Sequence, residues 1–247
     1  MQVRAYKTKK VLPGDDLFAI LGQSLPKLKE NSIVAVTSKI IAICEGRVAD
    51  DTDETRDRLV AEEAAYYLPR HSHKYDFCIS IKNNTFVATA GIDRSNGNGK
   101  LVLWPKNPQQ AVNDIRTFLQ KTYNLKHIGV ITTDSKTSPF RWGVSGTSLA
   151  HSGFNTLKSY VGEEDIFGRP LQFEKLNIAE SVASACVAVM GEGAEQTPLA
   201  VVTDISFVEF QDCNPTEEEL KGLRIDMEDD VFYPLFTAVD WKKGKGK

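Results

Sequence analysis

The chain has 247 residues, of which 41% are hydrophobic and 26% charged, and its formal net charge is −3. These proportions exclude a disordered or fibrous chain, and the length suits one large domain or two small intertwined ones. No apolar run approaches the roughly 18 residues needed to cross a bilayer. The N-terminal residues have no apolar core of the kind a secretory signal requires. We therefore expect a cytoplasmic protein with no membrane partner.

The charge pattern also argues against a nucleic-acid partner. Nucleic-acid-binding proteins normally carry a basic domain or stripe, whereas the only basic run here is 242–247, where Lys and Gly alternate. We expect one domain over residues 1–247, with a flexible, solvated tail from about residue 241.

The spacing of apolar residues predicts helices and strands in mixed order along the chain. Helices are expected after the break at 12–16, over 56–67, from Asn107 and Pro108 onward, and over 178–189; strands are expected before residue 12 and over 33–36, 76–81, 85–90, 127–133 and 198–203. The turn 82–84 predicts a hairpin between two of these strands. Because strands and helices do not alternate strictly, the expected fold class is α+β or an irregular α/β arrangement.

Four segments place polar side chains directly after apolar runs, where functional sites are often built. In the first, Thr37, Ser38 and Lys39 follow the strand 33–36. Hydroxyl groups and an ammonium suit phosphate oxygens, but the same residues could simply cap a helix and face solvent.

The second segment, residues 88–99, is rich in Gly, Asn and small side chains. Asp93 and Asn96 offer oxygen ligands and an amide there. The segment is not a Walker loop, because Arg94 stands where a glycine is required and Leu101 stands where Ser or Thr is required. A glycine-rich hairpin loop is the alternative interpretation.

The third and fourth segments contribute further acids. Asp134 and Ser135 end the strand 127–133, and Arg141 follows. An acid beside a hydroxyl can hold a divalent cation next to a phosphate, and an Arg can neutralise a phosphoryl or carboxylate group. Glu192 lies at a helix C-terminus, where the helix dipole disfavours a carboxylate. Three such acids without nearby His or Cys indicate Mg²⁺ or Mn²⁺ rather than zinc, with solvated surface acids as the alternative.

Five motifs occur together in the order of a known family. They are Thr37-Ser38-Lys39 with Glu45-Gly46-Arg47, the block 90–96, Thr133-Asp134-Ser135 with Arg141-Trp142-Gly143, Asp165-Ile166-Phe167-Gly168-Arg169, and Met190-Gly191-Glu192-Gly193. Together these motifs resemble the coenzyme F420:L-glutamate ligase (F420-0:γ-glutamyl ligase) family over about 11–232. The block 90–96, Ala-Gly-Ile-Asp-Arg-Ser-Asn, is the most specific of them.

The resemblance implies an amide ligase in which GTP phosphorylates a substrate carboxylate and the amine of L-glutamate attacks the acyl phosphate. It implies two divalent ions, Mg²⁺ or Mn²⁺, and a family-specific fold of two interleaved lobes that forms a homodimer. By motif, the metal ligands are Asp93, Asp134, Ser135 and Glu192; the nucleotide contacts are Leu12, Ser38, Lys39, Asn96, Gly191 and Gly193; the catalytic residues are Arg141 and Asp134. Phosphoryl transfer depends on positioning and charge neutralisation more than on a protein nucleophile, which fits this set.

The sequence also departs from the family pattern. Lys136-Thr137-Ser138-Pro139 replaces a Gly-Arg pair, Ile43 and Cys44 stand where relatives usually carry a Lys, and Ala179-Glu180-Ser181 replaces Ala-Asp-Glu. The acceptor is therefore left open between F420-0 and a folate-like molecule. A non-catalytic nucleotide- or metal-binding module is the alternative from another class.

Two groups of apolar residues have two interpretations each. Phe140 and Trp142 could stack on a flat acceptor ring or pack into the core. Residues near the C-terminus could form a dimer interface or cover the protein's own core: Phe207, Val208, Phe210, Phe232, Tyr233 and Phe236.

Overall fold

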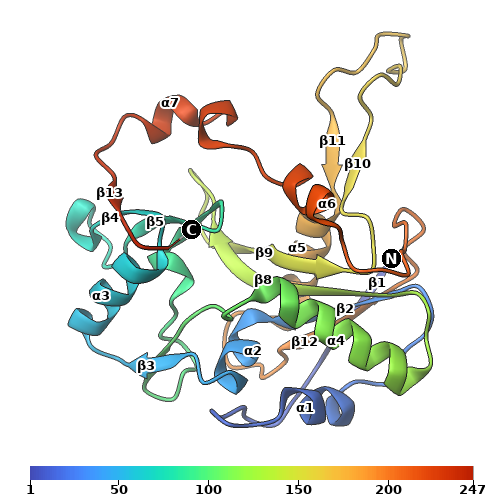
Figure 1. The fold of residues 1–247 in the computed structure, drawn as a ribbon, viewed down its shortest axis with the longest axis horizontal. Helices are drawn as coiled ribbons and strands as arrows, with labels where there is room; N and C mark the ends of the chain where they lie inside the picture. Colours follow the sequence, from blue (N-terminus) through green and yellow to red (C-terminus); the bar gives the residue numbers. More distant parts are fainter. Residues whose placement is uncertain (247) are drawn as a thin grey trace.

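The computed structural model describes residues 1–246 and has a mixed α+β architecture built on a central five-stranded sheet (Figure 1). In spatial order the strands of this sheet are β1 (Gln2–Tyr6), β12 (Leu199–Thr203), β2 (Ser32–Thr37), β8 (Ile128–Thr137) and β9 (Val144–Ser152). Strands β2 and β8 run parallel, and all other neighbours run antiparallel. The expected class is confirmed.

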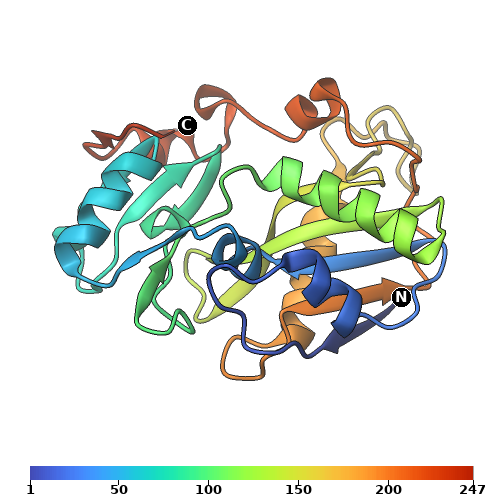
Figure 2. The same cartoon turned by 60° about the horizontal axis from the view of Figure 1, so that its bottom comes forward.

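Helices cover both faces of the central sheet (Figures 1 and 2). The covering helices are α1 (Leu17–Ser24), α2 (Ser38–Cys44) and α4 (Pro108–Tyr123) on one face and α5 (Ile178–Met190) on the other. In β2, Val34 and Val36 pack toward the first group, while Ile33 and Ala35 pack toward α5. Burial on both faces explains why β2 reads as a continuous apolar run rather than an alternating one.

Local sequence determines where the helices begin. The Asp16 carboxylate accepts hydrogen bonds from the first turn of α1, and the Asn107 side chain accepts one from Gln110 N at the start of α4. Pro108 fits the first turn of α4 because its missing N–H would have no partner there. The predicted apolar face of α4 is confirmed, with Ile115 and Leu119 fully buried.

A second lobe forms from the chain between α2 and α4. Its four-stranded sheet has the order β13 (Lys242–Lys243), β4 (Tyr66–Leu68), β5 (Ile79–Lys82) and β6 (Thr85–Ala88); β3 (Val48–Asp50) pairs with β7 (Lys100–Val102), and α3 (Asp53–Glu63) packs against this lobe. Because β13 pairs with β4, the C-terminal tail expected to be a free solvated end lies against this lobe within the described residues.

Several predicted boundaries are wrong, and the strand predicted over 76–81 covers only Ile79–Lys82. The helix predicted over 56–67 covers Asp53–Glu63, and the aromatic residues that follow form β4, where pairing with β5 outweighs helical spacing. The predicted hairpin is confirmed, but β6 ends at Ala88 because the next two residues adopt positive φ. Lys136 and Thr137, expected in a loop, extend β8 through pairing with β9.

In the described part of the chain, the remaining elements are a projecting ribbon, the C-terminal helices and three short 3₁₀ turns. A long ribbon formed by β10 (Leu157–Ser159) and β11 (Lys175–Asn177) projects from the body of the molecule (Figure 1). The C-terminal segment carries α6 (Glu217–Gly222) and α7 (Tyr233–Phe236), and short 3₁₀ turns occur at Arg70–Ser72, Thr89–Gly91 and Met227–Asp229. Within residues 1–246, none of the helices is both long enough and apolar enough to cross a membrane.

Some of the apolar residues near the C-terminus pack against the protein's own core, and others are exposed. Val208 is buried and Phe210 packs against the same core as α5, and Phe236 contacts Phe86 at 5.7 Å between ring centroids. Phe207 and Phe232 remain exposed. Part of this set therefore covers the protein's own core.

Candidate functional site

A cleft of about 730 Å³ lies at the end of β2, where Thr37 pairs with Thr133 and β8 continues to Thr137. Besides the end of β2 and the adjacent part of β8, it is lined by α2, the segment after β1, the loop that follows β6 and the loop between α5 and β12. The predicted site residues in its lining are Leu12, Lys39, Asp93, Asn96, Asp134, Ser135, Gly191, Glu192 and Gly193. The fold thus brings together residues that are up to 181 positions apart in the chain, from Leu12 to Gly193.

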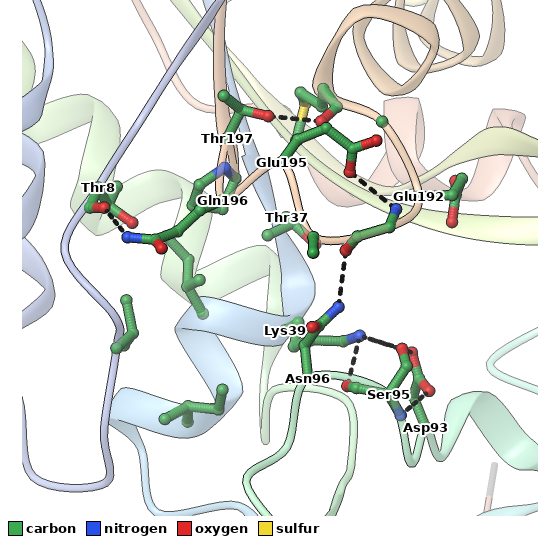
Figure 3. Close-up of a pocket in the computed structure, with 18 of the residues that line it drawn as sticks. Thr8, Thr37, Lys39, Asp93, Ser95, Asn96, Glu192, Glu195, Gln196 and Thr197 are labelled. Carbon is green, nitrogen blue, oxygen red and sulfur yellow. Dashed lines mark hydrogen bonds and ion pairs between the residues drawn. The ribbon is translucent and has the colours of Figure 1, made fainter.

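An ion pair occupies one side of this cleft (Figure 3). Lys39 Nζ lies 2.6 Å from Asp93 Oδ2 and donates to Ser95 O and Ser95 Oγ, both at 3.0 Å. Burial alone would raise the pKa of the Asp93 carboxyl, but the Lys39 ammonium and the hydrogen bonds from Ser95 outweigh it and lower that pKa. Asp93 is therefore held ionised beside a cation.

Asp134 lies in a different electrostatic environment. Burial raises the pKa of its carboxyl to about 6, and the charge of Asp93 adds to this effect, while a hydrogen bond donated by Trp104 Nε1 opposes it. The register between β8 and β9 shifts between Thr132 and Thr133, just before Asp134, because Leu149 of β9 has no partner on β8. Irregularities of this kind in a strand pair are frequent beside active sites.

The loop after α5 closes the other side of the cleft (Figure 3). Asn96 Nδ2 donates to Gly193 O at 2.9 Å, so this loop is tied to the loop that carries Asp93. Gly191 has a φ of +79°, and a Cβ there would lie within 2.7 Å of the Glu195 carboxylate. Ser135 Oγ donates to Glu192 Oε1 at 2.6 Å, which joins the predicted hydroxyl and acid directly.

Two predicted site residues do not line the cleft. Ser38 is buried as the first residue of α2. Arg141 lies in the exposed β8–β9 turn, where its guanidinium donates to Phe140 O at 3.0 Å. Phe140 and Trp142 are 99% and 92% exposed, so packing into the core is excluded for both.

The donor set suits a hard divalent cation. Asp93, Asp134 and Glu192 supply carboxylate oxygens and Ser135 a hydroxyl, which are the ligands Mg²⁺ and Mn²⁺ prefer. The mutual repulsion of Asp93 and Asp134 is the kind of interaction a bound cation relieves. Across residues 1–246, no three His, Cys, Asp or Glu side chains form a ready metal cage. Mg²⁺ commonly binds through one or two carboxylates plus substrate phosphates, and this cleft fits that mode.

Sequence reasoning missed several residues of this site. Trp104, Thr8 and Glu195 were not predicted, although Trp104 contacts Asp134, and the other two line the cleft. Gln196 Nε2 donates to Thr8 O at 2.6 Å and ties the first segment of the chain to the late loop. No local pattern marks Trp104 or Thr8, because the partners in these two contacts lie 30 or more positions away.

Comparison with known proteins places this chain among ligases. A family model described as F420-0:Gamma-glutamyl ligase matches residues 5–204. The chain therefore belongs to the F420-0:γ-glutamyl ligase family, as its motifs predicted.

Several relatives carry the name coenzyme F420:L-glutamate ligase. The chain is 28% identical to the one from Methanopyrus kandleri over 233 residues, covering 87% of this chain and 88% of that protein. It is 30% identical to the one from Methanocaldococcus jannaschii over 195 residues, covering 71% and 76%. It is 36% identical to the one from Methanococcus maripaludis strain S2 over 158 residues, covering 64% and 61%. The predicted enzyme class, a ligase, is confirmed.

Proposed function

We propose that this enzyme uses GTP and divalent metal ions to join L-glutamate to a carboxylate acceptor through an acyl phosphate. The γ-phosphoryl group passes to the acceptor carboxylate, and the glutamate amine then displaces phosphate to form the amide. The observation that carries the proposal is the convergence of Lys39, Asp93, Asp134, Ser135 and Glu192 in one cleft at the end of β2, beside its parallel neighbour β8. Ligands of open sheets characteristically bind at such strand ends.

In the proposed reaction, the charge of each side chain of the cleft indicates its role. Bound Mg²⁺ or Mn²⁺ supplies charge neutralisation between the protein acids and the nucleotide phosphates. Asp93, Asp134, Ser135 and Glu192 are the side chains that would hold it. Lys39, which carries a positive charge 2.6 Å from Asp93, is suited to bind phosphate oxygens once a metal ion takes over Asp93. Asn96 holds the two facing loops together through its bond to Gly193 O.

The acceptor is proposed to be F420-0, the substrate named by the family. A folate-like acceptor is the second candidate, favoured by the departure from the family pattern at Lys136–Pro139. Phe140 and Trp142, freely accessible beside Arg141, could stack on the flat ring that both acceptors present.

Mass spectrometry tests the reaction directly. Purified enzyme is incubated with GTP or ATP, Mn²⁺, L-glutamate and each acceptor in turn, and products are examined for added glutamate. We expect glutamylated product with GTP and one acceptor, with Asp114→Asn active as a control because Asp114 is an exposed acid on α4 outside the cleft. Nucleotide and metal binding without any product would instead favour the non-catalytic module.

We also propose that the enzyme acts as a homodimer. Ile166, Phe167 and Phe173 on the projecting β10–β11 ribbon are strongly exposed, together with Phe140 and Trp142. Exposed apolar groups of this size typically mark an interaction surface. Light scattering at micromolar concentration should give twice the monomer mass, and a monomer would contradict this proposal.

A further inference from the structure

Trp104 is a buried indole that connects the second lobe to the cleft. It follows β7, is only 2% exposed, and donates its Nε1–H to Asp134 Oδ2. An indole N–H is only ever a donor and does not titrate in the physiological range. It therefore offers Asp134 a fixed hydrogen bond that occupies one oxygen of the carboxylate.

A buried charge network holds this indole in place. Lys82 Nζ lies over the Trp104 ring at 4.9 Å from its centroid and pairs with Glu63 Oε2 at 2.8 Å. Arg47 pairs with the other oxygen of Glu63 at 2.7 Å and donates its Nε–H to Trp104 O at 3.2 Å. The ring face and the backbone of Trp104 are thus both restrained by charged side chains.

The indole of Trp104 packs closely against the backbone of Gly91. A Cβ added at Gly91 would lie 2.1 Å from Trp104 Nε1. Gly91 belongs to the same loop as Asp93, so this contact connects the position of the indole to Asp93 as well as to Asp134. The indole fits against this loop only because Gly91 has no side chain.

We propose that Trp104 is a positioning residue for metal binding: its N–H engages Asp134 Oδ2 and thereby fixes the orientation in which the carboxylate meets the cation. This inference rests on the proposed function, which assigns Asp134 as a metal ligand. Residues that hydrogen-bond a ligating side chain fix its orientation, and their loss typically weakens metal binding or activity about 10- to 100-fold.

Mn²⁺ binding to the full chain, followed by electron paramagnetic resonance with a non-hydrolysable GTP analogue and without acceptor, tests this role. We expect Trp104→Phe to weaken Mn²⁺ binding about 10- to 100-fold. The matched control is Trp241→Phe, since Trp241 Nε1 donates to Phe236 O at 2.6 Å and does not line the cleft. It should bind Mn²⁺ like the wild type. Unchanged Mn²⁺ affinity in folded Trp104→Phe would overturn the proposal.

Two further measurements separate positioning from a general structural effect. The double variant Trp104→Phe/Asp134→Asn should bind Mn²⁺ no more weakly than Asp134→Asn alone, because Trp104 acts through Asp134; additive losses would overturn the proposal. Should Trp104→Phe not fold, β-(3-benzothienyl)alanine at position 104 keeps the ring shape and replaces the N–H by sulphur, and the same loss is expected.

The same titration distinguishes this inference from the proposed function. If Asp134→Asn loses Mn²⁺ binding and the Trp104 variants do not, the inference fails and the metal assignment stands. If the wild type binds no Mn²⁺, or Asp134→Asn binds it as tightly as the wild type, both are overturned.

Discussion

His151 on β9 should make the stability of this protein depend on pH well above the range in which most carboxylates titrate. Its side chain is 3% exposed and lies edge-on to Phe154, with ring centroids 5.6 Å apart. Burial lowers the pKa of the imidazole from 6.5 to about 4, and the attraction of Glu219 only partly opposes this shift. The native protein therefore excludes a proton that the unfolded chain accepts.

The sign and size of the effect follow from linkage. Because the pKa of the His151 imidazole is depressed in the native state, its contribution to the free energy of unfolding is complete above pH 6.5. This contribution is lost as the pH falls toward 4. Between pH 7 and pH 5, the free energy of unfolding should fall by about 2 kcal/mol from this residue. Asp134 acts in the opposite direction, since its raised pKa of about 6 lets the native state keep a proton that the unfolded chain releases. Between pH 7 and pH 5, protonation of Asp134 therefore raises the free energy of unfolding by about 1 kcal/mol.

A comparison of variants isolates the His151 effect. Urea unfolding of wild type and His151→Gln is followed by circular dichroism at pH 7 and pH 5 without divalent metal. Asp134 is present in both proteins, so the stability of wild type relative to the variant should drop by about 2 kcal/mol at the lower pH. His71→Gln is the matched control, because His71 is exposed, and should show no such change. Parallel pH dependence of wild type and His151→Gln would refute the reasoning.

Three other predictions concern the site and the core. Asp134→Asn should abolish glutamate ligation while the protein stays folded, and wild-type turnover, measured by the mass-spectrometric assay, would remove Asp134 from the mechanism. Arg141→Ala should abolish ligation or raise the KM for the acceptor while metal-dependent nucleotide binding persists; equal loss of nucleotide binding would move Arg141 to the phosphate side, and unchanged kinetics would exclude it. Gly146→Ala should destabilise the fold by about 1 to 3 kcal/mol in urea unfolding, because its Cβ would lie 2.4 Å from Ala183 O, whereas Gly222→Ala, with open space around it, should be close to neutral.

The sequence by itself determined the elements whose signals are local. The apolar spacing predicted the helices that follow the break at 12–16 and Asn107, and the turn 82–84 predicted a hairpin. These succeed because helix and turn preferences depend on neighbours a few residues away. Of the eleven site residues that the family motifs predicted, nine line the cleft.

Only the tertiary structure decided which of these residues meet. Strand pairing ended α3 early and extended β8 past Asp134, because hydrogen bonds to a distant strand outweighed local spacing. The same pairing left Arg141 in an exposed turn beyond the cleft. Trp104 gained its contact with Asp134, and His151 its depressed pKa, from the packing of distant segments. Desolvation and hydrogen bonding depend on residues that are close in space but distant in the chain. A local sequence pattern therefore does not predict them.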